Sequence, residues 1–442
     1  MAEQNVWTRS ANRNNGNNTF IVNSSGNVNN NNAQNANRCA PDRSGDSEQN
    51  GRGTAAAPRE AAAGSHDPEP ERAEQSRGDA GAAGTRSRCT RPGHRPQLEP
   101  GELNGVVGFL ALRESAKKCR RGVMWKDSVA GYMMHLSERT LLLHRELTEG
   151  RYKAGAVRSF TVTQPKRREI VSVGFRDRVF QRSLNDNSIY PRMVSGFVLD
   201  NAACQTGKGT DFARERLKEF MRRHYRKHGP NGWVMQADVS GYYPNMSHEV
   251  AEATFAAKLP PEIMELALST MRRQYPGDVG YNPGSQMIQI AGISVLDPLD
   301  HVMKDRMRAR NYVRYMDDMV AITGPKAEAQ ALLAAAGDTL HTLGLEPNPK
   351  KSRVYPLRDG ISFLGFRFVL TPTGKVLMLL LPANVKQERR KLAKLVRLAK
   401  NGRMMRWQVD ECFDAWRNHA SKGDSTTLIR RMDAWYSGLW KE

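Results

Sequence analysis

Two adjacent aspartates in the stretch "NYVRYMDDMVAI" (311–322) constrain the fold of this chain more than any other feature. Asp317 and Asp318 stand between apolar and aromatic residues, where neighbouring carboxylates repel and burial of even one is costly without a positive partner. The residues on either side predict two short strands joined by a tight turn at Met316 and Asp317. We therefore expect a positively charged partner at this turn.

A third acid, Asp238, ends the predicted buried strand "WVMQADV" (233–239). If this strand and the turn belong to one antiparallel sheet, the three carboxylates can meet. A site made only of carboxylate oxygens suits Mg²⁺, which takes few protein ligands and leaves positions for water and phosphate. Two such ions about 4 Å apart can activate a 3′-hydroxyl and neutralise a leaving pyrophosphate. This chemistry requires no nucleophilic Ser or Cys.

The positive charge of the chain is concentrated after residue 100. Residues 1–100 contain 12 Arg, no Lys and 11 acidic residues, a balance of +1, so +20 of the formal net charge of +21 lies in 101–442. A folded region this basic most often binds a polyanion, and nucleic acid is the leading candidate. The alternative is a surface made basic for solubility alone.

The first hundred residues differ in composition from the rest. The first forty contain 14 Asn, and 41–100 are rich in Ala, Gly, Pro, Arg and Glu with few large apolar residues. Neither composition can offset the entropy lost on ordering, so we predict a disordered extension over 1–100. Five scattered Cys with no CxxC pair argue against a disulfide framework and a zinc site. Without an apolar segment typical of a signal peptide or a membrane span, we expect a cytoplasmic protein.

Residues 101–442 mix helical and strand patterns. Apolar residues at helical spacing predict basic helices over 211–228 and through 383–442, and a helix over 327–344 that ends at Gly344. The stretch "ISFLGFRFVL" (361–370) is typical of strands. These patterns place the acids in a sheet and a basic helical region after it.

With these residues in hand, the chain resembles a reverse transcriptase. "ADVSGYYPN" (237–245) resembles the first palm motif, "YMDD" (315–318) the catalytic hairpin, and "LGLEPNPKKSRVYPLRDGISFLGFRF" (343–368) the next two palm elements. Upstream, "FTVTQPKRREIVSVGFRDRVFQ" (160–181) and "CQTGKGT" (204–210) resemble fingers motifs. The resemblance implies an α+β right-hand fold, with fingers at 101–232, a palm with an antiparallel sheet at 233–370 and a helical basic thumb at 371–442.

The resemblance assigns roles residue by residue. It makes Asp238 and Asp317 the ligands of two Mg²⁺ ions, for which Mn²⁺ can substitute, with Asp318 supporting the site. Tyr243 would be the aromatic gate that crowds a ribose 2′-hydroxyl and favours deoxynucleotides. Lys351 would approach the pyrophosphate as it forms. Further contacts with the incoming nucleotide are implied for Lys166, Arg168 and Gln289.

Contacts with the template RNA and the RNA/DNA duplex are expected at the fingers loop, the catalytic hairpin and the thumb. In "GKG" (207–209) the lysine is followed by Gly instead of Ser or Thr, so the phosphate-loop pattern fails. The two glycines are close-approach positions beside nucleic acid or simply a turn. The predicted nucleic-acid contacts are Gly207, Lys208, Gly209, Tyr315, Met316, Lys386, Arg389, Arg390, Lys394 and Arg397.

Among bacterial enzymes the chain is most similar to reverse transcriptases of diversity-generating retroelements. "PGSQMIQIAGISVLDPLDH" (283–301) resembles their fourth motif, although Ile288 replaces the usual Ser before Gln289, and a literal Ser-Gln occurs instead at Ser285 and Gln286. The Asn-rich stretch 6–42 resembles the variable segment of retroelement target proteins. The likeness implies synthesis that is error-prone at template adenines and a small basic accessory protein that forms a ring.

Two other interpretations stay open at this point. One is a retron-like, group II intron-like or antiviral reverse transcriptase, and the other is a catalytically idle RNA-binding scaffold of the same fold. The intact acids argue against a scaffold, because an idle site has no metal to offset their repulsion.

Overall fold

The computed structural model describes residues 21–22, 28–29, 102–162, 168–282 and 284–441. The predicted disorder of 1–100 therefore lies outside the described residues, apart from two short strands, β1 (Ile21–Val22) and β2 (Val28–Asn29), which pair antiparallel. Within the described part of the chain, no helix combines the length and the apolar character that crossing a bilayer would require.

A four-stranded antiparallel sheet forms the centre of the described structure, with strands in the order β6, β7, β5, β8. The strands are β5 (Trp233–Ala237), β6 (Tyr312–Tyr315), β7 (Asp318–Thr323) and β8 (Arg353–Pro356). β6 and β7 form the predicted hairpin, whose turn holds only Met316 and Asp317. Nearly every residue of this hairpin is buried, which explains why the stretch is so apolar.

Two long helices pack against this sheet. α8 (Thr210–His228) contacts β6 and β7, and α14 (Lys326–Thr342) contacts β5, β7 and β8. α8 buries Leu217, Phe220 and Met221 and leaves basic residues exposed, as its pattern predicted. α14 ends where predicted, because Gly344 adopts a left-handed backbone with φ of 69° and lets the chain turn back.

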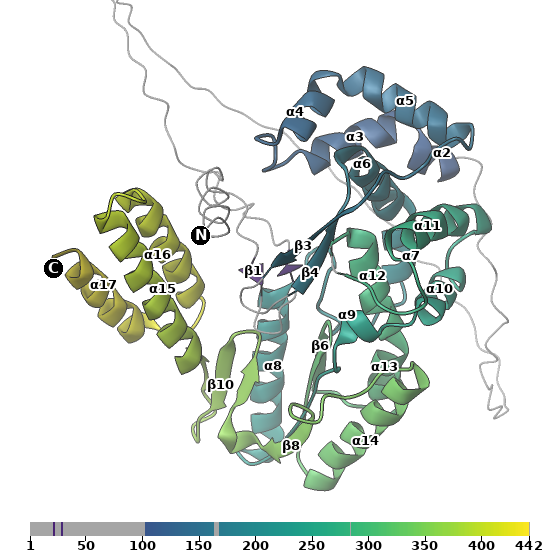
Figure 1. The fold of residues 1–442 in the computed structure, drawn as a ribbon. Coiled ribbons are helices and arrows are strands. Elements are labelled where there is room, and N and C mark those ends of the chain that lie inside the picture. The colour runs from purple at the N-terminus through teal and green to yellow at the C-terminus, as the bar shows by residue number, and fades with distance from the viewer. Residues whose placement is uncertain (1–20, 23–27, 30–101, 163–167, 283, 442) are drawn as a thin grey trace, which may run out of the picture. The chain divides into compact units, whose positions relative to one another are not determined.

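Short helices connect β5 to β6 and pack mainly on one another and, through α13, on α14 (Figure 1). They are α9 (Tyr242–Asn245), α10 (His248–Ala256), α11 (Pro261–Gln274), α12 (Gln286–Val295) and α13 (Asp297–His301), followed by a π-helical turn, η2 (Val302–Arg306). α12 is the most deeply buried of them. It brings the predicted fourth motif next to the tyrosines of α9.

The predicted fingers region is mostly helical. It contains α2 (Glu102–Val107), α3 (Phe109–Cys119), α4 (Asp127–Met134), α5 (Leu136–Thr148), α6 (Phe175–Leu184), the π-helical turn η1 (Asn185–Ile189) and α7 (Tyr190–Val194). A two-stranded ribbon, β3 (Arg158–Val162) and β4 (Arg168–Ser172), projects from these helices. Its strands flank part of the predicted "PKRRE" motif.

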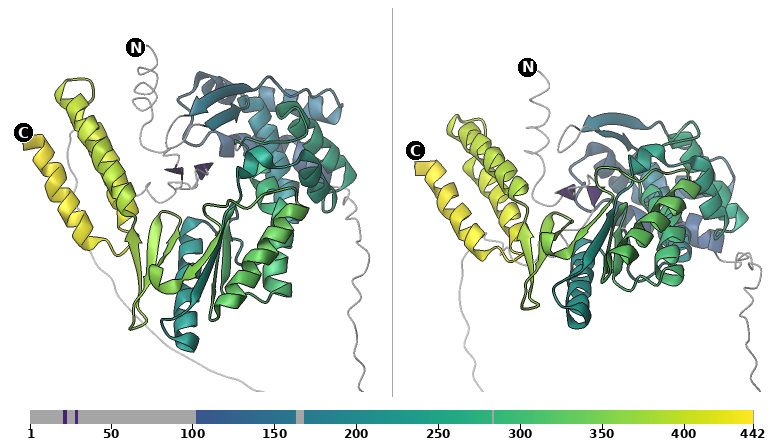
Figure 2. Two further views of the ribbon diagram at one scale, coloured as in Figure 1. Left: turned by 60° about the horizontal axis from the view of Figure 1, so that its bottom comes forward. Right: turned by 90° about the horizontal axis from the view of Figure 1, so that it is seen from below.

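The C-terminal region begins with a second, three-stranded sheet and ends in three helices. The sheet consists of β9 (Ile361–Phe363), β10 (Phe366–Leu370) and β11 (Val376–Leu380), and a short 3₁₀ turn, η3 (Leu357–Asp359), leads into it. The helices are α15 (Pro382–Lys400), α16 (Arg406–Ala420) and α17 (Thr426–Lys441). Figure 2 shows the three helices together beyond this small sheet.

Polar contacts tie α8 to this C-terminal region. Arg214 on α8 donates to the Leu364 carbonyl (2.9 Å) in the β9–β10 turn, and Asp211 accepts from Lys422 (2.7 Å) after α16. The helical fingers, the central sheet and the helical thumb confirm the predicted α+β right-hand polymerase fold. The exact domain boundaries stay a prediction. The predicted boundary between palm and thumb, after residue 370, falls inside the hairpin formed by β10 and β11.

Candidate active site

The three predicted carboxylates converge at one end of neighbouring strands. β5 and β7 pair antiparallel up to Ala237 opposite Met319, so the next register position sets Asp238 opposite Asp318. Asp317, in the hairpin turn, directly precedes Asp318, the first residue of β7. Asp238 is only 3% exposed, whereas Asp317 and Asp318 are half-buried. The sheet thus brings together acids that lie about eighty residues apart in the chain.

A loop after α14 fixes the orientation of Asp238. Lys351 donates from Nζ to Oδ1 of Asp238 (2.8 Å), and Asn348 donates from Nδ2 to Oδ2 (3.1 Å). The backbone N–H of Asn348 also donates to the Asp238 carbonyl (2.7 Å), and the Ser352 hydroxyl lies 3.3 Å from the same carbonyl. Both carboxylate oxygens and the main chain of Asp238 are therefore held by one short loop.

Lys351 brings one positive charge to the three acids. Burial alone would lower its pKa, but the hydrogen bond and charge of Asp238, together with the charges of Asp318 and Asp317, raise the pKa above its ordinary value. The ammonium therefore stays protonated and interacts with all three carboxylates. The side chain is 46% exposed, so it can move away from Asp238 without disturbing the core.

The residues at this site fit a divalent metal by their donor chemistry. The acids offer only oxygens, and the single positive charge of the Lys351 ammonium offsets only part of the negative charge of the three carboxylates. Among the described residues, no three His, Cys, Asp or Glu side chains are grouped as a ready-made metal cage. Mg²⁺ does not require such a cage, since it binds through one or two carboxylates and completes its shell with water and substrate phosphate. Asp238 and Asp317 would hold it, as the sequence predicted.

Tyr243, the predicted gate, lies beside the acids. Its ring is buried, and its hydroxyl makes no hydrogen bond with any residue that the structure describes. Burial together with the nearby charge of Asp317 raises its pKa well above the ordinary value. The ring packs closely on Gly292 of α12, where an added Cβ would lie 2.9 Å from the Tyr243 hydroxyl. Gly292 therefore lets the Tyr243 ring sit deeply against α12. The role of Tyr243 in sugar selection stays a prediction.

The structure separates the two possible Gln positions of the fourth motif. Ser285 is the N-cap of α12, where its hydroxyl accepts from the Ile288 N–H (3.2 Å), and Gln286 is exposed. Ile288 is fully buried in the core, and Gln289 is half-buried on the next position of the helix. The literal Ser-Gln pair thus begins a helix. The nucleotide contact predicted for Gln289 stays a prediction.

The other predicted nucleotide contacts fall partly outside the described residues. Lys166 lies outside them, and Arg168 is the first residue of β4 with a side chain that is not described. In the fingers loop, Gly207 has a left-handed backbone with φ of 75°, whereas Gly209 is extended. Lys208 donates to the carbonyls of Leu199 (2.9 Å) and Asn201 (3.0 Å). Its ammonium thus contacts its own loop, and contact with nucleic acid stays a prediction.

Tyr315 and Met316 are buried in the hairpin, with exposed fractions of 2% and 3%. The Met316 sulfur lies 3.7 Å from the Cys204 sulfur, so the fingers loop touches the catalytic turn. This burial was not foreseen when both residues were predicted to contact nucleic acid, because the "YMDD" sequence alone does not show which face the adjoining loop covers. That contact stays a prediction.

The predicted basic face of the thumb is present on α15. Five of its side chains are exposed and lie on one side of the helix by their spacing: Lys386, Arg389, Arg390, Lys394 and Arg397. Leu392 and Val396 are buried on the adjoining side of the helix, next to Arg389. Arg389 also lies over the ring of Trp435 at 5.0 Å, which supports packing as the role of this aromatic residue. A basic face of this kind suits a phosphate backbone.

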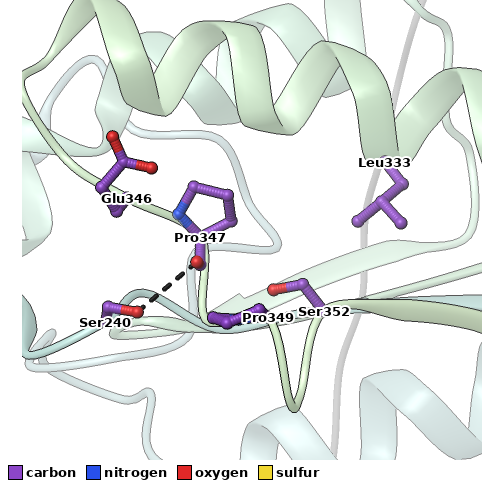
Figure 3. Close-up of a pocket in the computed structure, with 6 residues that line it drawn as sticks. All are labelled: Ser240, Leu333, Glu346, Pro347, Pro349 and Ser352. Atoms are coloured by element: carbon purple, nitrogen blue, oxygen red, sulfur yellow. Dashed lines mark hydrogen bonds between the residues drawn. The ribbon is translucent and has the colours of Figure 1, made fainter.

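A cavity of about 520 Å³ lies beside the loop that holds Asp238 (Figure 3). Its lining residues are Ser240, Leu333, Glu346, Pro347, Pro349 and Ser352. The Ser240 hydroxyl donates across it to the Pro347 carbonyl (3.4 Å). Ser352 lines the cavity and also contacts the Asp238 carbonyl. The cavity therefore borders the loop that holds Asp238, but none of the three aspartates lines it.

Sequence reasoning missed several residues that support the site. Asn348 and Gly292 had no recognisable signal, since neither their type nor their spacing is unusual. Arg314 and Asp300 had one. A charged residue inside the otherwise apolar strand "YVRYM" is rare in a buried position unless a partner faces it. The structure shows that Asp300 is that partner.

Comparisons with known proteins give one family match and one structural similarity. Residues 166–368 match the family described as reverse transcriptase (RNA-dependent DNA polymerase). No significant match exists among curated protein sequences. Among solved structures, the chain is similar to apo telomerase from Candida tropicalis truncated from its C-terminal domain, with 10% identity, a TM-score of 0.39, and coverage of 50% of this chain and 54% of that one. The matched residues include all three aspartates, and the chain therefore contains a reverse transcriptase domain.

Proposed function

We propose that this chain is an RNA-directed DNA polymerase that copies a template RNA into cDNA by two-metal nucleotidyl transfer. The observation that carries the proposal is the convergence of Asp238, Asp317 and Asp318 around the Lys351 ammonium. Acids held this close are stable only with strong positive charge among them. The exposed basic face of α15 supports a duplex of RNA and DNA as the second substrate.

In this mechanism the carboxylates of Asp238 and Asp317 would hold two divalent ions, and their oxygen-only donor set suits Mg²⁺. When bound, such ions activate the primer 3′-hydroxyl and neutralise the leaving pyrophosphate. Asn348 keeps the Asp238 carboxylate aimed during this step. Lys351, whose side chain is 46% exposed, would exchange its contact with Asp238 for one with the pyrophosphate, which its positive charge suits. Tyr243 limits the space beside the sugar.

The proposal is tested by primer extension with an RNA template, a DNA primer, dNTPs and Mg²⁺. We expect incorporation by the unmodified protein and a loss of at least about 100-fold in Asp317→Asn, because the variant removes an electrostatic contact made to the reacting groups. Asp305→Asn is the matched control, since Asp305 is exposed and bonds only to His301 in the described contacts. Duplex binding without any incorporation would favour an RNA-binding scaffold.

The finer part of the proposal is that the enzyme diversifies a target gene by mutagenic retrohoming. The resemblance of residues 283–301 and 204–210 to diversity-generating retroelement enzymes supports it. We propose template RNA, dNTPs and a small basic accessory ring as partners, acting in the cytoplasm. Sequencing of cDNA made from a heteropolymeric RNA should show errors concentrated at template adenines, with and without the accessory protein. Faithful copying of adenines would instead favour a retron-like, group II intron-like or antiviral enzyme.

A further inference from the structure

Arg314 is a fully buried charge directly beside the catalytic turn. Both it and its partner Asp300 have side chains that are 0% exposed. Removing two charges from water is expensive, and a buried ion pair is often no more stabilising than apolar residues of the same volume. Stability alone therefore gives a weak reason for an arginine in the middle of strand β6.

The guanidinium of Arg314 is held by Asp300 in a two-pronged arrangement. Nε donates to Oδ1 of Asp300 (2.7 Å) and Nη2 donates to Oδ2 (2.5 Å). Tyr312 donates to the same Oδ1 (2.8 Å), and Nη2 also donates to the Ile293 carbonyl of α12 (3.1 Å). A planar guanidinium fixed on two edges has no rotational freedom left.

The remaining edge of the guanidinium faces the catalytic turn. Nη1 of Arg314 donates to the Met316 carbonyl (2.9 Å). Met316 has a left-handed backbone with φ of 56°, a conformation that is unfavourable for an L-residue because its Cβ comes too close to the following carbonyl oxygen. Such conformations persist only where the surroundings hold them. The bond to Arg314 is a contact of that kind, made to the strained residue itself.

The backbone of Arg314 is also fixed, so the guanidinium acts from a rigid base. Its N–H donates to the Asp200 carbonyl (3.0 Å), and its carbonyl accepts from the Ala202 N–H (2.9 Å). The Met316 carbonyl lies in the same peptide plane as the Asp317 N–H. Fixing that carbonyl therefore fixes the plane from which the Asp317 side chain starts.

We infer that Arg314 is a positioning residue, which holds the left-handed Met316 turn through its carbonyl and thereby aims the Asp317 carboxylate toward Asp238. Its role in catalysis rests on the proposed polymerase function. Asp300 belongs to the same device, because it fixes the guanidinium. A lysine cannot replace the arginine, since one ammonium cannot keep two contacts to Asp300 and reach the Met316 carbonyl at the same time.

The test compares Arg314→Lys and Asp300→Asn with a control pair elsewhere. Arg192→Lys serves as the control, because Arg192 makes a two-pronged, partly buried ion pair with Glu102 in the fingers. Single-turnover incorporation should fall about 100-fold in both test variants, the loss expected for a small misplacement of a reacting group. Apparent affinities for primer–template and dNTP should change less than about threefold, since neither test residue touches substrate.

Hydrogen exchange measured by mass spectrometry separates this inference from the proposed function. In both variants, the peptide covering 311–323 should exchange faster than in the unmodified protein, while peptides from α14 and from the fingers should not. This readout needs no catalysis, so it decides the positioning role even if the unmodified protein incorporates nothing.

Two results would overturn the inference. One is full single-turnover activity of folded Arg314→Lys. The other is a rate that falls only in proportion to the folded fraction, with faster exchange spread over the whole palm, because that pattern belongs to general destabilisation. If Arg314→Lys does not fold, Asp300→Asn decides alone, since it keeps the side-chain volume and one acceptor oxygen.

Discussion

At the scale of single residues, the geometry of the candidate active site depends on neighbouring side chains that hold the aspartates in place. Lys351 and Asn348 aim Asp238, and Arg314 holds the backbone that precedes Asp317. Gly292 adds a different kind of control. It contributes no atoms to the site and instead leaves the space that the Tyr243 ring occupies.

We predict that Gly292→Ala sharpens discrimination against ribonucleotides. The new methyl group would lie 2.9 Å from the Tyr243 hydroxyl and 3.2 Å from two ring carbons, so the ring must move away from α12. The space beside the sugar then shrinks. The ratio of dNTP to rNTP incorporation should rise by about tenfold, the usual scale for one methyl group in a close-fitting pocket.

Gly337→Ala is the matched control for this prediction. Gly337 lies inside α14, and a Cβ there meets no atom within 4 Å. It should leave the ratio unchanged. An unchanged ratio in Gly292→Ala as well would show that the depth of the Tyr243 ring does not set sugar selection.

At the scale of elements, the hairpin, the strand ending at Asp238 and the long helices could be predicted from local patterns. A helix such as α14 shows in the spacing of its apolar residues, and the β6–β7 turn shows in two short apolar runs around Asp317. The loop that holds Asp238 could not be predicted. It lies 110 to 113 residues further along the chain, and no periodic signal connects the two.

The same limit explains the missed ion pair of Arg314 and Asp300. The sequence shows a buried-strand arginine that must have a partner, but many acids in the chain could serve. Only the packing of α13 against β6 selects Asp300. The helices and strands themselves were largely predictable from the sequence. Which side chains of distant elements contact one another becomes known only from the structure.

His419 makes the packing of the thumb on the small sheet sensitive to pH. Its ring packs at a tilt of 41° against Phe366 of β10, with 5.0 Å between the ring centroids. Burial, with the charges of Arg214 and Lys422, lowers the pKa of His419 from 6.5 to about 4. As the pH falls, His419 is therefore protonated in the unfolded chain at a higher pH than in the folded protein. The stability that His419 contributes is present above pH 6.5 and is lost as the pH falls toward 4.

We expect His419→Gln to remove this part of the pH dependence. Between pH 7 and pH 4.5, thermal unfolding should shift to lower temperature by less in His419→Gln than in the unmodified protein. The exposed His135 provides the control, and His135→Gln should behave like the unmodified protein. Parallel curves for all three proteins would show that His419 is not buried neutral in solution.

At the scale of the whole molecule, the positive charge is arranged for a long polyanion. The net charge of +20 carried by residues 101–442 includes the five exposed bases on one side of α15. Contacts of this kind supply affinity that depends on salt and not on sequence. The reverse transcriptase domain supplies the chemistry, and the thumb supplies the grip on the duplex in the proposed function.

We predict that the double variant Lys394→Gln, Arg397→Gln weakens binding of an RNA/DNA duplex and lowers the slope of log affinity against log salt concentration by about 2, close to one unit per lost phosphate contact. Binding is measured by fluorescence anisotropy at several salt concentrations. Arg139→Gln on α5 is the control, since it removes an exposed charge from the fingers. An unchanged slope in the double variant would exclude α15 from the duplex interface.

The most direct test of the central claim is a count of bound metal ions in the complex that precedes chemistry. The protein is combined with an RNA template, a DNA primer that lacks its 3′-hydroxyl and the matching dNTP, and Mn²⁺ binding is followed by electron paramagnetic resonance. We predict two ions that are magnetically coupled at about 4 Å, with coupling lost in Asp238→Asn and in Asp317→Asn. Two uncoupled ions, or the same coupled pair in Asp317→Asn, would contradict a catalytic site built on these aspartates.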